Sequence, residues 1–102
     1  MQRHIRLAIY DLTNGSFSEV SDLAKQGMLP IFSQEPGFIE YGVADIGNRQ
    51  VCSITVWETR EQAERSVNVA QTWVSQNLAD RVKLVHSYIG ELGFLHGAPV
   101  LA

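Results

Sequence analysis

The hydrophobic residues change their spacing several times along this chain, and the order of those changes constrains the fold more than any other feature. Four segments alternate with the period of two that is typical of a β-strand: residues 4–11, 38–45, 51–57 and 82–92. Residues 16–32 and 59–78 repeat at helical spacing, and 93–102 follow as a tail. The order predicts an α+β, ferredoxin-like fold, β-α-β-β-α-β, with one antiparallel four-stranded sheet.

Each predicted helix begins with a capping box, in which the first hydroxyl accepts a hydrogen bond from the backbone N–H three residues later. Ser16 and Glu19 form the first box, and Thr59 and Gln62 form the second. Gly27 and Pro30 interrupt the apolar stripe of the first helix, and because Pro30 removes a backbone hydrogen bond we expect a kink or two short helices there. The second helix contains no glycine or proline and is predicted to run without interruption.

The third predicted strand has apolar residues on both of its faces. Trp57 lies on one face, and Cys52 and Ile54 lie on the other. Two helices can cover only one face of a four-stranded sheet, so the other face is expected to be polar if it meets water. Because an uncovered apolar face is typical of an association site, we expect a homodimer in which two sheets pack face to face.

Length and charge exclude several classes of protein. The 102 residues leave room for a single domain, predicted over 1–102. A net charge of −3 and scattered Lys and Arg residues argue against nucleic-acid binding, which needs clustered positive charge. No apolar run approaches the ~20 residues that span a bilayer, so no membrane association is expected. The single cysteine, Cys52, excludes an internal disulfide and fits a cytoplasmic location.

Two stretches carry a resemblance to a known family. Gln34-Glu35-Pro36-Gly37-Phe38 leads into the second strand, and Ser53-Ile54-Thr55-Val56-Trp57-Glu58-Thr59-Arg60-Glu61-Gln62-Ala63 joins the third strand to the long helix. Over residues 4–92 the chain resembles the antibiotic-biosynthesis-monooxygenase-like family of dimeric α+β barrels. Members of known chemistry use molecular oxygen on electron-rich aromatic polyketides, often without a cofactor, and a related branch degrades haem. The resemblance implies a dimeric barrel and an oxygen-using monooxygenase without metal or flavin.

Only part of the family's functional pattern is kept. The cofactor-free monooxygenases have an Asn four positions before the strand-end Trp and a Tyr six positions after it. Here these positions hold Ser53 and Ala63, and Trp57 itself is kept. Ser53 can still donate a hydrogen bond to a phenolate-like substrate, with a shorter reach. The haem-degrading branch has a His ten positions after the Trp, where Val67 stands, so haem degradation is not expected.

Several residues are candidates for binding a ligand. Trp57 either forms the aromatic wall of a cleft between sheet and helices or closes the core. Ser53 and Thr55 share its strand face, so their hydroxyls either face a cavity or bond to the backbone. Phe32 and Trp73, on the two helices, either add to the wall of that cleft or extend the core.

His86 is the candidate catalytic base, because a neutral imidazole can remove a phenolic proton. Alternation along the last strand puts Leu84, His86 and Tyr88 on one face, which adds Tyr88 to the ligand-binding candidates. The alternative is a structural His86, or one at the dimer interface. The three His residues and one Cys lack the spacing of zinc ligands, so no metal site is predicted.

Two functions are compatible with these features. In the first, a cytoplasmic homodimer binds a small apolar or aromatic molecule near Trp57 and oxygenates it without a cofactor. Ser53 then donates a hydrogen bond, and His86 or a bound water takes the phenolic proton. In the second, the same homodimer binds a ligand or a partner without catalysis, which is the function favoured by the missing Asn and Tyr.

Overall fold

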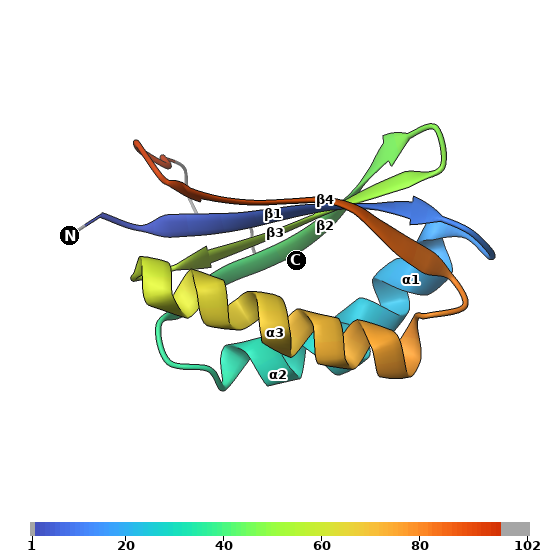
Figure 1. Cartoon of the computed structure of the whole chain (residues 1–102), viewed down its shortest axis with the longest axis horizontal. Coiled ribbons are helices and arrows are strands. Elements are labelled where there is room, and N and C mark those ends of the chain that lie inside the picture. Colours follow the sequence, from blue (N-terminus) through green and yellow to red (C-terminus); the bar gives the residue numbers. More distant parts are fainter. Residues whose placement is uncertain (1, 97–102) are drawn as a thin grey trace.

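The predicted order of strands and helices is confirmed by a computed structural model that describes residues 2–96. The remainder of the predicted tail, 97–102, lies outside the described residues. The elements are β1 (His4–Leu12), α1 (Phe17–Leu23), η1 (Ala24–Met28), α2 (Leu29–Ser33), β2 (Phe38–Gly47), β3 (Gln50–Trp57), α3 (Arg60–Asn77) and β4 (Val82–Glu91). The strands form one antiparallel sheet in the order β2-β3-β1-β4, which is the ferredoxin-like arrangement. Figure 1 shows the helices on one side of this sheet.

The strand register gives the sheet two different faces. Pairs on the face toward the helices join β1 to β3: Arg6 with Thr55, Ala8 with Ser53, and Tyr10 with Val51. Pairs on the opposite face, which we call the open face, are Ile5 with Val56, Leu7 with Ile54, and Ile9 with Cys52. Burial of Cys52 raises the pKa of its thiol. Within residues 2–96, no helix is long and apolar enough to cross a membrane.

The first helical region is interrupted, as predicted at Gly27 and Pro30, and the interruption is a π-helical turn. η1 lies between α1 and α2 in one continuous helical run, and Pro30, which has no N–H to donate, falls in the first turn of α2 directly after the π-helical turn. Gly27 lies against α3, because a Cβ at this position would be 2.6 Å from Cζ2 of Trp73. The glycine therefore lets η1 and α3 approach each other closely.

The predicted capping box begins α3. Thr59 Oγ1 accepts a hydrogen bond from the Gln62 N–H at 3.2 Å, and Gln62 Oε1 accepts one from the Thr59 N–H at 3.0 Å. Gly37 lies against this box with a φ of +81°, and a Cβ on it would collide with the Gln62 side chain. The turn before β2 and the start of α3 therefore pack as one unit, which brings together the two stretches that carry the family resemblance.

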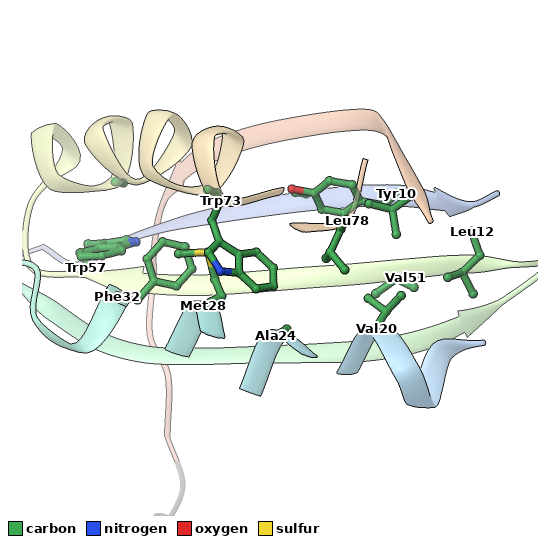
Figure 2. Close-up of a cluster of buried hydrophobic side chains, with 14 residues drawn as sticks. Tyr10, Leu12, Val20, Ala24, Met28, Phe32, Val51, Trp57, Trp73 and Leu78 are labelled. Atoms are coloured by element: carbon green, nitrogen blue, oxygen red, sulfur yellow. The ribbon is translucent and has the colours of Figure 1, made fainter. Parts of the chain in front are cut away.

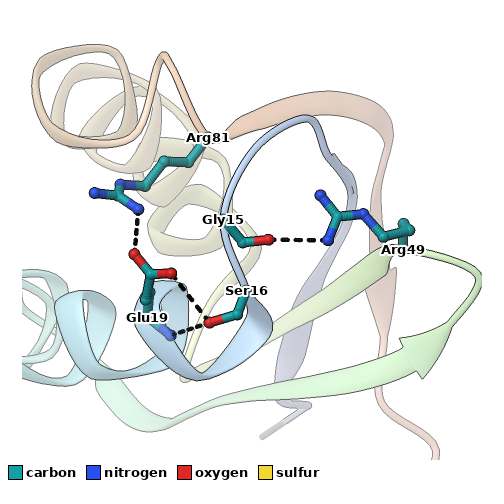
Figure 3. A network of polar contacts seen from close by, with 5 residues as sticks. All are labelled: Gly15, Ser16, Glu19, Arg49 and Arg81. Atoms are coloured by element: carbon teal, nitrogen blue, oxygen red, sulfur yellow. Dashed lines mark hydrogen bonds and ion pairs between the residues drawn. The ribbon is translucent and has the colours of Figure 1, made fainter.

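A network of polar contacts joins the loops at the other end of the sheet (Figure 3). The Ser16 hydroxyl accepts a hydrogen bond from the Glu19 N–H at 3.2 Å, as predicted. The Arg81 guanidinium donates to the Glu19 carboxylate at 2.6 Å, and this bond holds the pKa of Glu19 below its usual value. Arg49, in the turn between β2 and β3, donates to the Gly15 carbonyl at 2.9 Å. These bonds connect three loops that are far apart in the sequence.

Candidate functional site

A cavity lies between the helices and the sheet, next to η1. Most of its wall is apolar: Val20, Ala24, Met28, Phe32, Val43, Val51, Ala70, Trp73, Val74, Leu78 and Val82. Three hydroxyl-bearing residues, Tyr10, Tyr41 and Ser53, complete the lining. Figure 2 shows Trp73 extending from α3, and Met28 from η1, into the space between the helices and the sheet. The volume of about 30 Å³ is room for roughly one or two water molecules, so a larger ligand has to push the helices outward.

Two surface grooves adjoin the cavity and share walls with it. The β2 groove, of about 210 Å³, lies between η1 and β2, and it shares Tyr41 and Val43 with the cavity. The β4 groove, of about 250 Å³, lies between α3 and β4, and it shares Tyr10 and Val74 with the cavity. Tyr41 and Tyr10 therefore stand where the cavity meets the two grooves.

Tyr41 is a neutral hydrogen-bond donor in this environment. Burial raises the pKa of its phenol to about 12, the nearby Tyr10 acts in the same direction, and a contact with the Ser53 hydroxyl partly offsets both. The phenol is therefore protonated at neutral pH and can donate a hydrogen bond. Neutral donors within an apolar wall are suited to a ligand oxygen on which negative charge develops.

The cavity lining contains no charged side chain and no imidazole. Within residues 2–96, no three side chains of His, Cys, Asp or Glu are grouped closely enough to hold a metal ion. The chemistry that these wall residues can supply directly is therefore apolar contact and hydrogen bonding.

Three of the seven predicted site residues lie in the cavity wall: Phe32, Ser53 and Trp73. Trp57 lies in the core instead, where it is 1% exposed and the Phe32 and Phe38 rings meet its indole edge to face. It lines neither the cavity nor either groove. This position agrees with the structural interpretation of Trp57, as a residue that closes the core.

The prediction that Leu84, His86 and Tyr88 share a face is wrong. A β-bulge in β4 adds one residue, Val85, opposite β1. The residues after Val85 therefore lie on the opposite face of the sheet from the one that simple alternation predicts. Leu84 lines the β4 groove, whereas His86 and Tyr88 lie on the open face with their rings stacked at 5.9 Å. The two predicted catalytic residues, His86 and Ser53, are therefore on opposite faces of the sheet.

Tyr10 and Tyr41 line the cavity but were not among the predicted site residues. The alternation of the first strand puts Tyr10 on the same face as Arg6, which makes that face appear to be the more polar one. In the structure it is the face that the helices cover. The alternation of the strand correctly assigns Tyr10 to one face. It does not reveal which face is buried, because both faces of the strand carry apolar residues.

Comparison with known proteins finds the fold but no sequence relative: no family model matches the chain, and no curated protein matches it. Several solved structures do match. A candidate antibiotic biosynthesis monooxygenase from Chloroflexus aurantiacus J-10-fl has a TM-score of 0.66 at 17% identity, over 93% of this chain and 97% of that protein. SnoaB from Streptomyces nogalater, a cofactor-independent oxygenase, has a TM-score of 0.67 at 14% identity, over 98% of this chain and 100% of that protein.

MupZ from Pseudomonas fluorescens is a third match, with a TM-score of 0.70 at 13% identity, over 87% of this chain and 71% of that protein. Identities this low show a shared fold. The structural agreement over nearly the whole chain confirms, at the level of the fold, the resemblance carried by the two sequence stretches. This chain therefore has the fold of the antibiotic-biosynthesis-monooxygenase-like proteins.

Proposed function

We propose that this chain binds a small, planar, mostly apolar molecule with a phenol or enol oxygen in the cavity next to η1, and that it oxidises this molecule with molecular oxygen. The observation that carries the proposal is the set of Tyr10, Tyr41 and Ser53 hydroxyls in an otherwise apolar wall. Such a wall with a few polar groups is typical of a small-molecule site. The likeness of the fold to SnoaB, a cofactor-independent oxygenase, supports oxygen chemistry.

The hydroxyls of Tyr41 and Ser53 act on the ligand oxygen. Both donate hydrogen bonds to it and thereby stabilise its ionised form. The proton passes to water, since His86 lies on the open face. The ionised ring then gives one electron to O₂, and the resulting radical and superoxide join as a peroxide. Loss of water from the peroxide turns a ring CH₂ into C=O, so one oxygen atom enters the product, the other leaves as water, and the substrate supplies the electrons.

Oxygen uptake in the presence of a dihydroxyanthrone tests this function. We expect protein-dependent uptake of one O₂ per molecule of anthrone oxidised. Tyr41→Phe and Ser53→Ala should each lower the rate by about 100-fold, because each removes a donor to the developing oxyanion. Ser18→Ala removes an exposed hydroxyl on α1 and serves as the matched control. A panel of anthrones and hydroquinones that gives no uptake above the rate in buffer would contradict oxygenation.

A second candidate function is binding without catalysis. It is favoured by Ser53 and Ala63, which replace the hydrogen-bonding Asn and Tyr of the catalytic family members, and by the absence of an acid or base from the cavity lining. Saturable binding of naphthol to wild-type protein that consumes no oxygen with any anthrone would identify this second function.

The proposed assembly is a homodimer through the open face. The register puts Gly42, Ile54, Leu7 and Tyr88 in one row across the four strands, and Ile54 and Tyr88 are 39% and 56% exposed. Gly42 and Gly90 have no positive φ, and a Cβ on either would meet open space, so the single chain does not require glycine there. Glycine inside a strand often marks the close approach of another backbone, and a second copy packed face to face would supply one.

A further inference from the structure

Arg6 is buried between the sheet and α3 without a counter-ion among the described residues. The residue is 3% exposed, and the hydrogen bond that its guanidinium makes within residues 2–96 runs from Nε to Ser87 Oγ at 3.2 Å. Neither ion pair within those residues involves it. Because arginine stays charged and an unpaired buried charge is costly, Nη1 and Nη2 are groups that an anion would satisfy.

The surroundings of Arg6 are mostly apolar and open to a groove. Arg6 lines the β4 groove, a space of about 250 Å³, together with apolar residues that include Val67, Val74 and Leu84 and with the polar residues Gln71 and Ser75. Thr55, which pairs with Arg6 in the register, is buried, and its Oγ1 has no hydrogen-bond partner among the described residues. The described residues therefore leave Thr55 Oγ1 without a hydrogen-bond partner and give Arg6 no counter-ion.

We propose that the β4 groove binds an apolar monocarboxylate, with the carboxylate on Arg6 and the hydrocarbon body against Val67, Val74 and Leu84. The two Nη groups of a guanidinium match the two oxygens of a carboxylate. The apolar wall favours an organic acid over inorganic phosphate, which has no apolar body to bury. The groove lies on the helix side of the sheet, so a dimer through the open face leaves it accessible. The proposal needs no oxygen chemistry and stands apart from the function proposed above.

Calorimetric titration of the full chain with naphthoate, and with uncharged naphthamide, tests this site. The two probes share the same ring system and differ in the charge. Wild-type protein is expected to bind naphthoate about tenfold or more tightly than naphthamide. Arg6→Met should bring the naphthoate affinity down to that of naphthamide. Arg65→Met, at an exposed position on α3, is the matched control and should bind both probes like the wild type.

The thermal unfolding midpoint separates loss of the site from loss of the fold. Arg6→Met is expected to unfold at or above the wild-type temperature, because it removes an unpaired buried charge. If it does not fold, Leu84→Asp tests the same site: Leu84 is 46% exposed, and a carboxylate there should weaken naphthoate binding more than naphthamide binding, because both probes lose the apolar contact but only naphthoate is repelled. Equal affinity for the two probes, naphthoate binding unchanged in both variants, tighter binding of inorganic phosphate than of naphthoate, or no saturable binding at millimolar naphthoate would each overturn the proposal.

Discussion

The Trp73 indole occupies the space that a side chain on residue 27 would need: a Cβ at Gly27 would lie 2.6 Å from Trp73 Cζ2. This contact limits how closely η1 can approach α3. Gly27 belongs to the π-helical segment η1, and Trp73 is part of the cavity wall. The position of Trp73 in the cavity wall therefore depends on the absence of a side chain at Gly27.

We predict that Gly27→Ala destabilises the protein by about 1–3 kcal/mol, even though alanine is the better helix former. The cause is overpacking against Trp73, so the cost should be smaller when Trp73→Phe is also present. Urea unfolding of the two single variants and the double variant measures this. Gly93→Ala is the control, because a Cβ at Gly93 meets open space. A Gly27→Ala variant as stable as the wild type would show that η1 and α3 are not held in fixed contact at Gly27 and Trp73.

Tyr41 should titrate at a higher pH than an ordinary phenol does. Burial raises its pKa from 10.0 to about 12, so the folded state holds this proton more tightly than the unfolded state does. The resulting stabilisation is fully present below pH 10 and is lost as the pH rises through 12. Ultraviolet absorbance of tyrosinate should show one late step that is absent from Tyr41→Phe. A Tyr41 step near the ordinary phenol pKa would mean that its hydroxyl faces water.

Trp57 should act on stability and not on ligand binding. Trp57→Ala removes a fully buried indole and should cost about 3–5 kcal/mol. Trp57→Phe keeps an aromatic ring between Phe32 and Phe38, so the protein should fold and bind naphthol with wild-type affinity. Fluorescence titration of Trp57→Phe, in which Trp73 is the remaining tryptophan, checks this. A large loss of affinity in this variant would place Trp57 in contact with the ligand.

Dimerisation through the open face predicts a difference between two isoleucines of similar exposure. Ile54 on the open face is 39% exposed, and Ile31 on α2 is 41% exposed. Ile54→Lys should convert the dimer to a folded monomer, because it buries a charge in the apolar interface, whereas Ile31→Lys should remain dimeric. Sedimentation equilibrium gives the mass in each case. A monomeric wild type, or an Ile54→Lys dimer as tight as the wild type, would contradict this interface.

Local patterns were sufficient to predict the elements of the fold. The two capping residues, Ser16 and Thr59, mark the helix starts because their hydrogen bonds are made within four residues of sequence. The interruption at Gly27 and Pro30 also has a local cause, because proline lacks the N–H that continues the helix hydrogen bonds.

The site was harder to predict, because it depends on relationships between strands. One inserted residue, Val85, moves His86 away from the cavity, and alternation alone does not reveal an insertion. The choice between core and cleft for Trp57 depends on where Phe32 and Phe38 pack. The role of Tyr41 depends on which face of β2 the helices cover, and a strand with apolar residues on both faces does not encode that choice locally.

A ligand bound between Tyr41 and Trp73 must contact the Met28 side chain, which lines the same cavity. The chain has two methionines, so ¹³C-methyl labelling gives two signals, and Met28→Leu identifies the one from the cavity wall. We predict that naphthol shifts the Met28 signal in a saturable manner, and that Tyr41→Phe weakens the apparent affinity by about three- to tenfold through loss of one hydrogen bond. A Met28 signal that does not move up to the solubility limit of naphthol would contradict a ligand site next to η1.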